Sequence, residues 1–289
     1  PQAFGEMRTQ HIERLRQWLN LGGLRAEWIV ASTDPPISPV RYQDFWEASL
    51  DGQVGAPYTR EAWDQEISPF LSSLQEVALE VREVEKARKE FELSYRNEVF
   101  RQWERFLASF SKGEELSKGR SARRKLALKL LDSDESPYKR IVETASSSFT
   151  PLLEVTVQGS YTPAWAMMFQ RYKNLQIRTT ESQKQEEENP EISKERGKDE
   201  ELEALKYLSH YWEAFDQLRS EVVDTEKSFR SAQKAFEEGE SMNKGVHPIL
   251  KAAWSVRSLR KTIGFPKGED RIFWALLVRP AEFTWRVIM

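Results

Sequence analysis

The chain has 289 residues, of which 39% are hydrophobic and 31% charged, and its formal net charge is −3. This near-neutral balance excludes the overall basic field that nucleic-acid binding favours. The absence of cysteine excludes disulfides and thiolate metal sites. The longest apolar run, Ile272–Val278, has seven residues, far fewer than a membrane-spanning helix needs.

Glycine and proline occur only 13 times each, so long stretches are free of helix breakers. The 10 Trp and 15 Phe residues can supply a core despite the polar composition. We therefore predict an all-α fold, an elongated multi-helix bundle with two long amphipathic helices and at most one short strand-like segment. The chain starts at Pro1 without a signal peptide and ends on the apolar Trp285–Met289, so we expect a fragment of a longer protein.

The first 58 residues predict one helix and one ordered loop. Residues 6–31 carry apolar residues at helical spacing and are predicted to be helical. Residues 32–58 are rich in Pro, Gly and Asp, which is typical of a loop. We expect Tyr42, Phe45 and Trp46 to hold this loop to the core.

The next segment predicts the first long amphipathic helix. Thr59 is the predicted N-cap of a helix with Glu61 and Asp64 in its first turns, where the helix dipole favours acidic residues. A long helix is then predicted over residues 74–111, because apolar residues recur there mostly at steps of three, four or seven. This stripe consists of Val77, Val81, Val84, Phe91, Tyr95, Val99, Trp103, Phe106 and Phe110.

The middle of the chain predicts shorter elements. A basic helix over 121–132 is followed by one that starts at Ser136–Pro137, a cap residue followed by proline at the first helical position. The helical pattern ends at Thr150–Pro151. Residues 153–157 alternate between apolar and polar, which indicates a short strand or extended chain. A short helix is predicted over 162–173.

A highly charged stretch divides the chain. Residues 178–200 have almost no apolar anchor and are predicted to form a solvated, mobile loop. We therefore expect a first helical subdomain over 1–175, a charged mobile loop over 176–200, and a second helical part over 201–289. The alternative is one continuous domain.

The second long helix is predicted over residues 199–238, from a stripe that steps by four and three. Such a helix packs against another long helix at a shallow angle. We favour the 74–111 helix of the same chain over another chain, because bulky aromatics suit a globular core. Helices over 248–263 and 269–289 complete the chain. The stripe consists of Ala204, Leu208, Tyr211, Phe215, Leu218, Val222, Thr225, Phe229, Ala232 and Phe236.

Metal-binding patterns are absent from the sequence. A di-iron bundle needs a Glu three residues before a His, and none of His11, His210 and His247 has one. No His-Glu-x-x-His motif occurs either. We interpret His210 as a packed histidine of a core-facing helix, and we expect no metal site.

Nucleotide and nucleophile motifs also fail. The spacing from Gly113 to Gly119 is one residue too long for a phosphate loop, and Arg120 follows it. Gly239-Glu240-Ser241 begins a Gly-x-Ser-x-Gly pattern that Asn243 breaks. Five Ser-x-x-Lys matches lack their companion motifs. We therefore expect no catalytic residues, no cofactor and no enzymatic activity.

One basic cluster could suggest a polyanion partner. Acidic residues follow it closely, and residues 111–137 lack the interleaved aromatics that single-stranded nucleic acid requires. We interpret the cluster as the solvated face of a helix and expect no nucleic-acid partner. It consists of Lys118, Arg120, Arg123, Arg124, Lys125 and Lys129.

Three ordered stretches carry a family resemblance. They are Pro57–Trp63, Tyr95–Leu107 and Leu130–Ile141. Their order and spacing resemble the helical periplasmic region of the IcmF/TssM family, inner-membrane components of bacterial type VI secretion systems. The resemblance covers roughly residues 40–289, loosely after 150. The family's membrane helices, its cytoplasmic nucleotide-binding region and its C-terminal β domain are missing from this chain.

The resemblance implies a structural, non-catalytic role in the periplasm, as part of a protein anchored in the inner membrane by helices outside this chain. Implied partners are an inner-membrane subunit and an outer-membrane lipoprotein, mostly through parts outside this chain, and self-association is a further option. Direct membrane insertion by this segment is not expected, and its partner-binding residues are unknown. Two alternatives remain open: a generic helical adaptor or coiled-coil module that binds through 199–238, and an enzyme built from scattered carboxylates.

Overall fold

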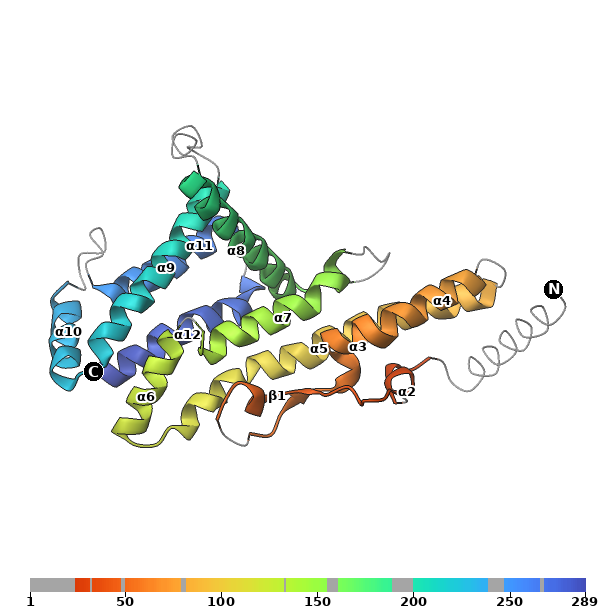
Figure 1. Cartoon of the computed structure of the whole chain (residues 1–289), viewed down its shortest axis with the longest axis horizontal. Helices are drawn as coiled ribbons and strands as arrows, with labels where there is room; N and C mark the ends of the chain where they lie inside the picture. Colours follow the sequence, from red (N-terminus) through yellow and green to blue (C-terminus); the bar gives the residue numbers. More distant parts are fainter. Residues whose placement is uncertain are drawn as a thin grey trace. The chain divides into compact units, whose positions relative to one another are not determined.

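The fold is all-α, as predicted, with helices and a single two-stranded hairpin in the part of the chain that the structure describes (Figure 1). The predicted helix over 6–31 lies largely outside this part, and its described portion is α2 (Ala26–Val30). A computed structural model describes residues 24–31, 33–47, 50–78, 82–132, 134–154, 161–188, 200–238, 247–265 and 268–289.

Two compact units share the chain, and each is assembled from separated segments. Unit 1 comprises residues 1–44, 51–106 and 154–161, and unit 2 comprises residues 45–50, 107–153 and 162–289. The charged stretch that was expected to divide the chain falls within unit 2. The expected division at residues 175 and 200 uses consecutive segments, whereas each of these units contains segments that are distant in the chain and pack together.

Unit 1 contains the hairpin, in which β1 (Val40–Arg41) pairs antiparallel with β2 (Gln53–Val54). The ring of Tyr42 stacks on Phe106 at 4.3 Å between centroids, and its hydroxyl donates to the Phe106 carbonyl (2.7 Å). Gly52 has a φ of +143°, and a Cβ there would lie 2.3 Å from the Tyr42 ring, so only glycine fits. The expectation that Tyr42 holds this loop to the core is confirmed.

Short helical elements lead from the hairpin into a longer helix. Thr59 caps α3 (Arg60–Ala62) as predicted, since its hydroxyl oxygen accepts a hydrogen bond from the backbone N–H of Ala62 (3.3 Å). After β2 come η2 (Ala56–Tyr58), α3, the π-helix η3 (Trp63–Ile67) and the longer α4 (Ser68–Ala78), whereas η1 (Tyr42–Asp44) lies between β1 and β2.

The long helix α5 (Arg82–Ala108) runs back along these elements. Phe91 contacts Phe70 edge to face at 6.1 Å, and further along α5 the indole N–H of Trp103 donates to the Tyr58 carbonyl (3.2 Å). The partners' residue numbers fall as α5 advances, so the two segments are antiparallel. These apolar side chains of α5 therefore pack against other elements of unit 1.

The helix predicted over 74–111 is wrong at both ends. Residues 74–78 belong to α4, and the 3-10 helix η4 (Phe110–Leu116) follows α5. The stripe from Val84 to Phe110 is buried as predicted, whereas the burial of Val77 and Val81 lies outside the description. The spacing of apolar residues cannot reveal that the chain reverses direction between α4 and α5, because both helices are amphipathic.

Unit 2 begins with two helices joined through Asp132. Its Oδ1 accepts hydrogen bonds from the backbone N–H groups of Asp134 (2.8 Å) and Glu135 (3.0 Å). Its other carboxylate oxygen pairs with Arg219 (2.7 Å). The two backbone hydrogen bonds, supported by Arg219, hold the pKa of the Asp132 carboxyl below its ordinary value. The helices are α6 (Arg120–Leu131) and α7 (Pro137–Glu154), both close to their predicted starts.

A buried aromatic cluster lies under this corner of unit 2. The indole of Trp46 contacts Phe110 at 5.2 Å and Tyr138 at 5.7 Å. A Cβ on Gly113 would lie 2.1 Å from the Trp46 ring, so this close approach requires glycine. The Tyr138 hydroxyl donates to the carboxylate of buried Glu114. The predicted burial of Trp46 is confirmed.

Two local predictions near residues 150–190 are corrected. Helix α7 continues through Pro151 to Glu154, so the extended segment at 153–157 is wrong for its first two residues, and the others lie outside the description. Helix α8 (Ala164–Glu188) is longer than the predicted 162–173. Residues 178–188 are consequently helical instead of a loop, because Glu, Gln and Lys are good helix formers even without apolar anchors.

The second long helix is also two helices, α9 (Glu200–Val222) and α10 (Thr225–Glu238). Asp224 separates them, since its Oδ1 accepts a hydrogen bond from the backbone N–H of Glu226 (2.6 Å) and so caps a new helix. The regular apolar spacing predicted a single continuous helix over 199–238. The capping Asp224 was overlooked because it occupies one polar position and leaves the apolar spacing on both sides of it unchanged.

Helix α9 packs mainly on α11 (Pro248–Ile263), and these two helices lie side by side in Figure 1. The Tyr211 hydroxyl donates to the Leu277 carbonyl (2.7 Å) and ties α9 to α12 (Arg271–Ile288). Both α11 and α12 lie close to their predicted positions. The partner predicted for α9, the 74–111 helix, instead lies mostly in unit 1.

Candidate functional site

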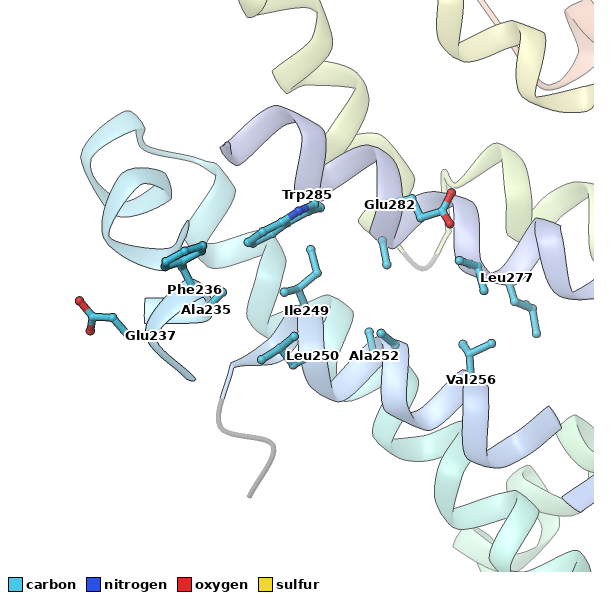
Figure 2. A pocket seen from close by; sticks show the side chains of 13 residues that line it. Ala235, Phe236, Glu237, Ile249, Leu250, Ala252, Val256, Leu277, Glu282 and Trp285 are labelled. Carbon is cyan, nitrogen blue, oxygen red and sulfur yellow. The ribbon is translucent and has the colours of Figure 1, made fainter. Parts of the chain in front are cut away.

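An apolar hollow of about 740 Å³ lies in unit 2 among α10, α11 and α12, and we term it the unit 2 groove (Figure 2). Its volume is within the range of small-molecule sites, and its lining is almost entirely apolar. The lining residues are Ala235, Phe236, Glu237, Ile249, Leu250, Ala252, Ala253, Val256, Leu277, Val278, Ala281, Glu282 and Trp285.

Small side chains on two facing helices create the groove. Ala252 on α11 and Ala281 on α12 contribute one methyl group each, so the helices leave a space between them that native packing would otherwise fill. Figure 2 shows Val256 and Leu277 facing each other across this space from the two helices. The alanines therefore form a shallow floor between larger apolar walls.

Helix α10 borders one end of the groove. Phe236 on α10 and Trp285 on α12 lie at this end, beside Leu250 (Figure 2). Phe236 is 77% exposed, although it belongs to a strongly amphipathic helix. Phe229 precedes it by seven residues, so the two rings share one face of α10, and Phe229 is 68% exposed.

The exposure of Phe229 and Phe236 corrects the predicted stripe. The stripe is buried from Ala204 to Val222, but in α10 the buried face is formed by small residues such as Ala232 and Ala235. Because a new helix starts after Asp224, the apolar face of α9 does not continue in register into α10. Both phenylalanines therefore lie outside the buried face of α10. Apolar side chains that the sequence assigned to the core are thereby presented at the surface next to the groove.

The charges at the groove are acidic. Glu237 on α10 and Glu282 on α12 are its charged lining residues, and both are exposed. Three cations of α11 and α12 form ion pairs with carboxylates that do not line the groove. These pairs are Lys251–Glu213 (2.8 Å), Arg260–Asp270 (3.7 Å) and Arg286–Glu114 (2.9 Å).

A Ser-His-Glu cluster lies where α9, α10 and α11 meet. His247 Nδ1 accepts a hydrogen bond from the backbone N–H of Ile249 (3.2 Å) and caps α11. Nε2 therefore carries the proton and donates to Ser231 Oγ (2.7 Å), while the serine hydroxyl donates to Glu221 Oε2 (2.5 Å). A nucleophilic serine needs the opposite polarity, in which histidine accepts the hydroxyl proton. The cluster is suited to joining three helices.

The histidines considered as ligands occupy different settings. His210 is half-buried on α9, and burial lowers the pKa of its imidazole. His247 is fully buried in the cap of α11, and His11 lies outside the described residues. Within the ranges that the structure describes, no three His, Asp or Glu side chains converge as a metal site would require.

The basic cluster of residues 118–129 lies on and just before α6. Lys129 pairs with Glu47 (2.6 Å), and the Arg123 guanidinium lies over the Phe283 ring, 5.9 Å from its centroid. Part of the cluster is therefore engaged in contacts within unit 2. That the cluster has no polyanion partner remains a prediction.

Among the helices described, none combines the length and apolarity needed to cross a membrane. Comparisons of the chain with models of protein families, with curated proteins and with solved structures find no match.

Neither the partner-binding residues nor the groove could be predicted from the sequence. Its lining comes from three helices, and most of the lining residues are small and large apolar residues of the kind that fill an ordinary core. The one local signal was the capping Asp224, which could have shown that the heptad is interrupted.

Proposed function

We propose that the chain is a non-catalytic helical scaffold of a bacterial secretion envelope complex, and that the unit 2 groove docks another protein subunit. The groove beside two exposed phenylalanines is the observation that carries this proposal. Contiguous exposed apolar surface typically marks an interaction site. A scaffold needs such surfaces and needs no convergent acid–base groups.

The stretches that resemble the IcmF/TssM family have packing and capping roles, which supports a structural function. The Tyr95 hydroxyl donates to the Pro57 carbonyl (3.0 Å), and Trp103 donates to the Tyr58 carbonyl, so the first two stretches are joined within unit 1. The third stretch contains Asp132, which joins α6 to α7. We accordingly propose a periplasmic location and partners among the inner-membrane and outer-membrane subunits of a type VI secretion system.

Site-specific photocrosslinking in the bacterium that carries the gene tests the proposal. A photoreactive amino acid replaces Phe236 in one strain and Tyr161, a 71% exposed residue of unit 1, in a control strain. We expect the Phe236 position to yield an adduct with a secretion-complex subunit, identified by mass spectrometry, that the Tyr161 position does not yield. Adducts confined to cytoplasmic proteins would favour the generic helical adaptor, and no specific adduct at Phe236 would refute docking at the groove.

A further inference from the structure

We infer that the occupant of the unit 2 groove is an amphipathic helix of another protein, with apolar residues on one face and Lys or Arg beside them. This inference rests on the proposed docking function and specifies its partner. Helix-in-groove recognition uses apolar anchors at i, i+3 or i+4, and i+7. Three properties of the groove select this occupant: its length, its extension along α10, and the sign of its charges.

The groove is long enough for about two helical turns. Its lining on α11 runs from Ile249 to Val256, which spans about 10 Å at the helical rise of about 1.5 Å per residue. On α12 it runs from Leu277 to Trp285, about 12 Å by the same rise. Two turns place three apolar anchors of a partner helix over the alanine floor.

Exposed apolar surface continues beyond the hollow. Phe236 lines the groove, and Phe229 lies about 10 Å further along α10 on the same face. A compact small molecule that fills the hollow would leave Phe229 in water. An elongated occupant that continues along α10 would cover both rings, which favours a helix over a small ligand.

The charges determine which helix fits. Glu237 and Glu282 lie on different helices at the rim of the groove, and the Glu237 carboxylate points away from the hollow (Figure 2), so cations at the outer edges of an apolar stripe would meet these carboxylates. A second copy of this chain that inserted its own α10 would bring another Glu237, next to its Phe236, towards Glu282. The cation beside Phe229 on that inserted α10, Arg230, already pairs with Glu226 of the same helix (2.5 Å), so the two glutamates would remain opposed. A basic partner helix is therefore favoured over self-association through this groove.

Two synthetic peptides test the inference with the intact chain. Both are fluorescein-labelled helices of about five turns with leucine at i, i+3, i+4 and i+7 repeats, and the positions beside the leucines are Lys in one and Glu in the other. We expect fluorescence anisotropy at low salt to show about tenfold tighter binding of the Lys peptide, from roughly two- to fivefold per exposed charge contact. The preference should shrink at high salt.

Variants locate the binding and reverse its charge preference. Ala253→Trp fills the groove from an exposed lining position, and Phe236→Ser removes a wall, so each should weaken Lys-peptide binding at least tenfold without loss of helicity. The double variant E237K/E282K should prefer the Glu peptide. The control E104K/E203K makes the same charge change at exposed residues outside the groove and should keep the wild-type preference.

Each result decides one question. Equal binding of the two peptides, or a preference that E237K/E282K does not reverse, would overturn the basic helix as occupant. Binding that neither Ala253→Trp nor Phe236→Ser weakens would place the peptide elsewhere and would likewise overturn the inference. Either outcome can coexist with a specific Phe236 photocrosslink, which would leave the scaffold proposal standing and require a different occupant.

Discussion

The same substitution at two positions of the predicted heptad should change stability by very different amounts. Phe215 lies on α9, is 1% exposed and contacts Tyr211 at 4.4 Å and Trp212 at 5.8 Å between ring centroids. Phe229 lies on α10 and is 68% exposed. A continuous buried stripe would make the two residues equivalent, whereas the interruption at Asp224 makes them different.

The expected magnitudes follow from burial. Phe215→Ala removes a fully buried ring and leaves a cavity, which should lower the free energy of unfolding by about 3–5 kcal/mol. Phe229 buries about a third of its surface, worth about 0.5–1 kcal/mol from the value for a fully buried side chain. The better helix propensity of alanine returns about 0.5 kcal/mol, so Phe229→Ala should change stability by less than about 0.5 kcal/mol.

Urea unfolding followed by far-UV circular dichroism measures both effects. The slope with denaturant should be unchanged, so that midpoints report stability. If the two units unfold in separate transitions, the comparison applies to the transition of unit 2. Phe236→Ala should behave like Phe229→Ala. A loss of more than about 2 kcal/mol in Phe229→Ala would mean that α10 is packed with its phenylalanines inward, which would refute both the interruption and the exposed surface beside the groove.

Three further predictions test the interior of unit 2. Asp132→Ala should cost about 1 kcal/mol in denaturant unfolding at pH 7, as for other lost caps. The fold lowers the pKa of this carboxyl, so its contribution to stability is complete above the ordinary value of 3.8 and declines as the pH falls through the lower folded value. The stabilities of wild type and variant should therefore converge in acid, and a stability difference that stays constant with pH would argue against this role of Asp132. Gly113→Ala should cost about 1–3 kcal/mol because the new methyl group meets the Trp46 ring, and Trp46→Phe in the same chain should restore part of the loss; an unchanged thermal midpoint would contradict the contact. His247→Ala should cost about 1–3 kcal/mol because the cap of α11 and the hydrogen bond to Ser231 are lost, and His247→Asn should cost less. His210→Ala should cost under about 1 kcal/mol, so equal effects of the two alanine variants in thermal unfolding would exclude the capping role of His247.

Local chemistry determined the class of fold and most helix starts. The scarcity of glycine and proline predicts helices, and the structure contains them. Thr59 and the Pro248 start act as the sequence predicts, because capping depends on groups within one turn. The stripe of α5 was likewise recognisable, since 3.6-residue periodicity needs no knowledge of the partner.

Only the tertiary structure decided where the chain reverses and which apolar residues reach solvent. Periodicity reports the face of a helix and not its direction, so the division between α4 and α5 was missed. One side-chain cap at Asp224 rotates α10, and Phe229 and Phe236 are exposed although their spacing matches buried Phe215. The unit 2 groove likewise depends on how three helices meet, because a hollow between alanines exists only once α11 and α12 lie side by side.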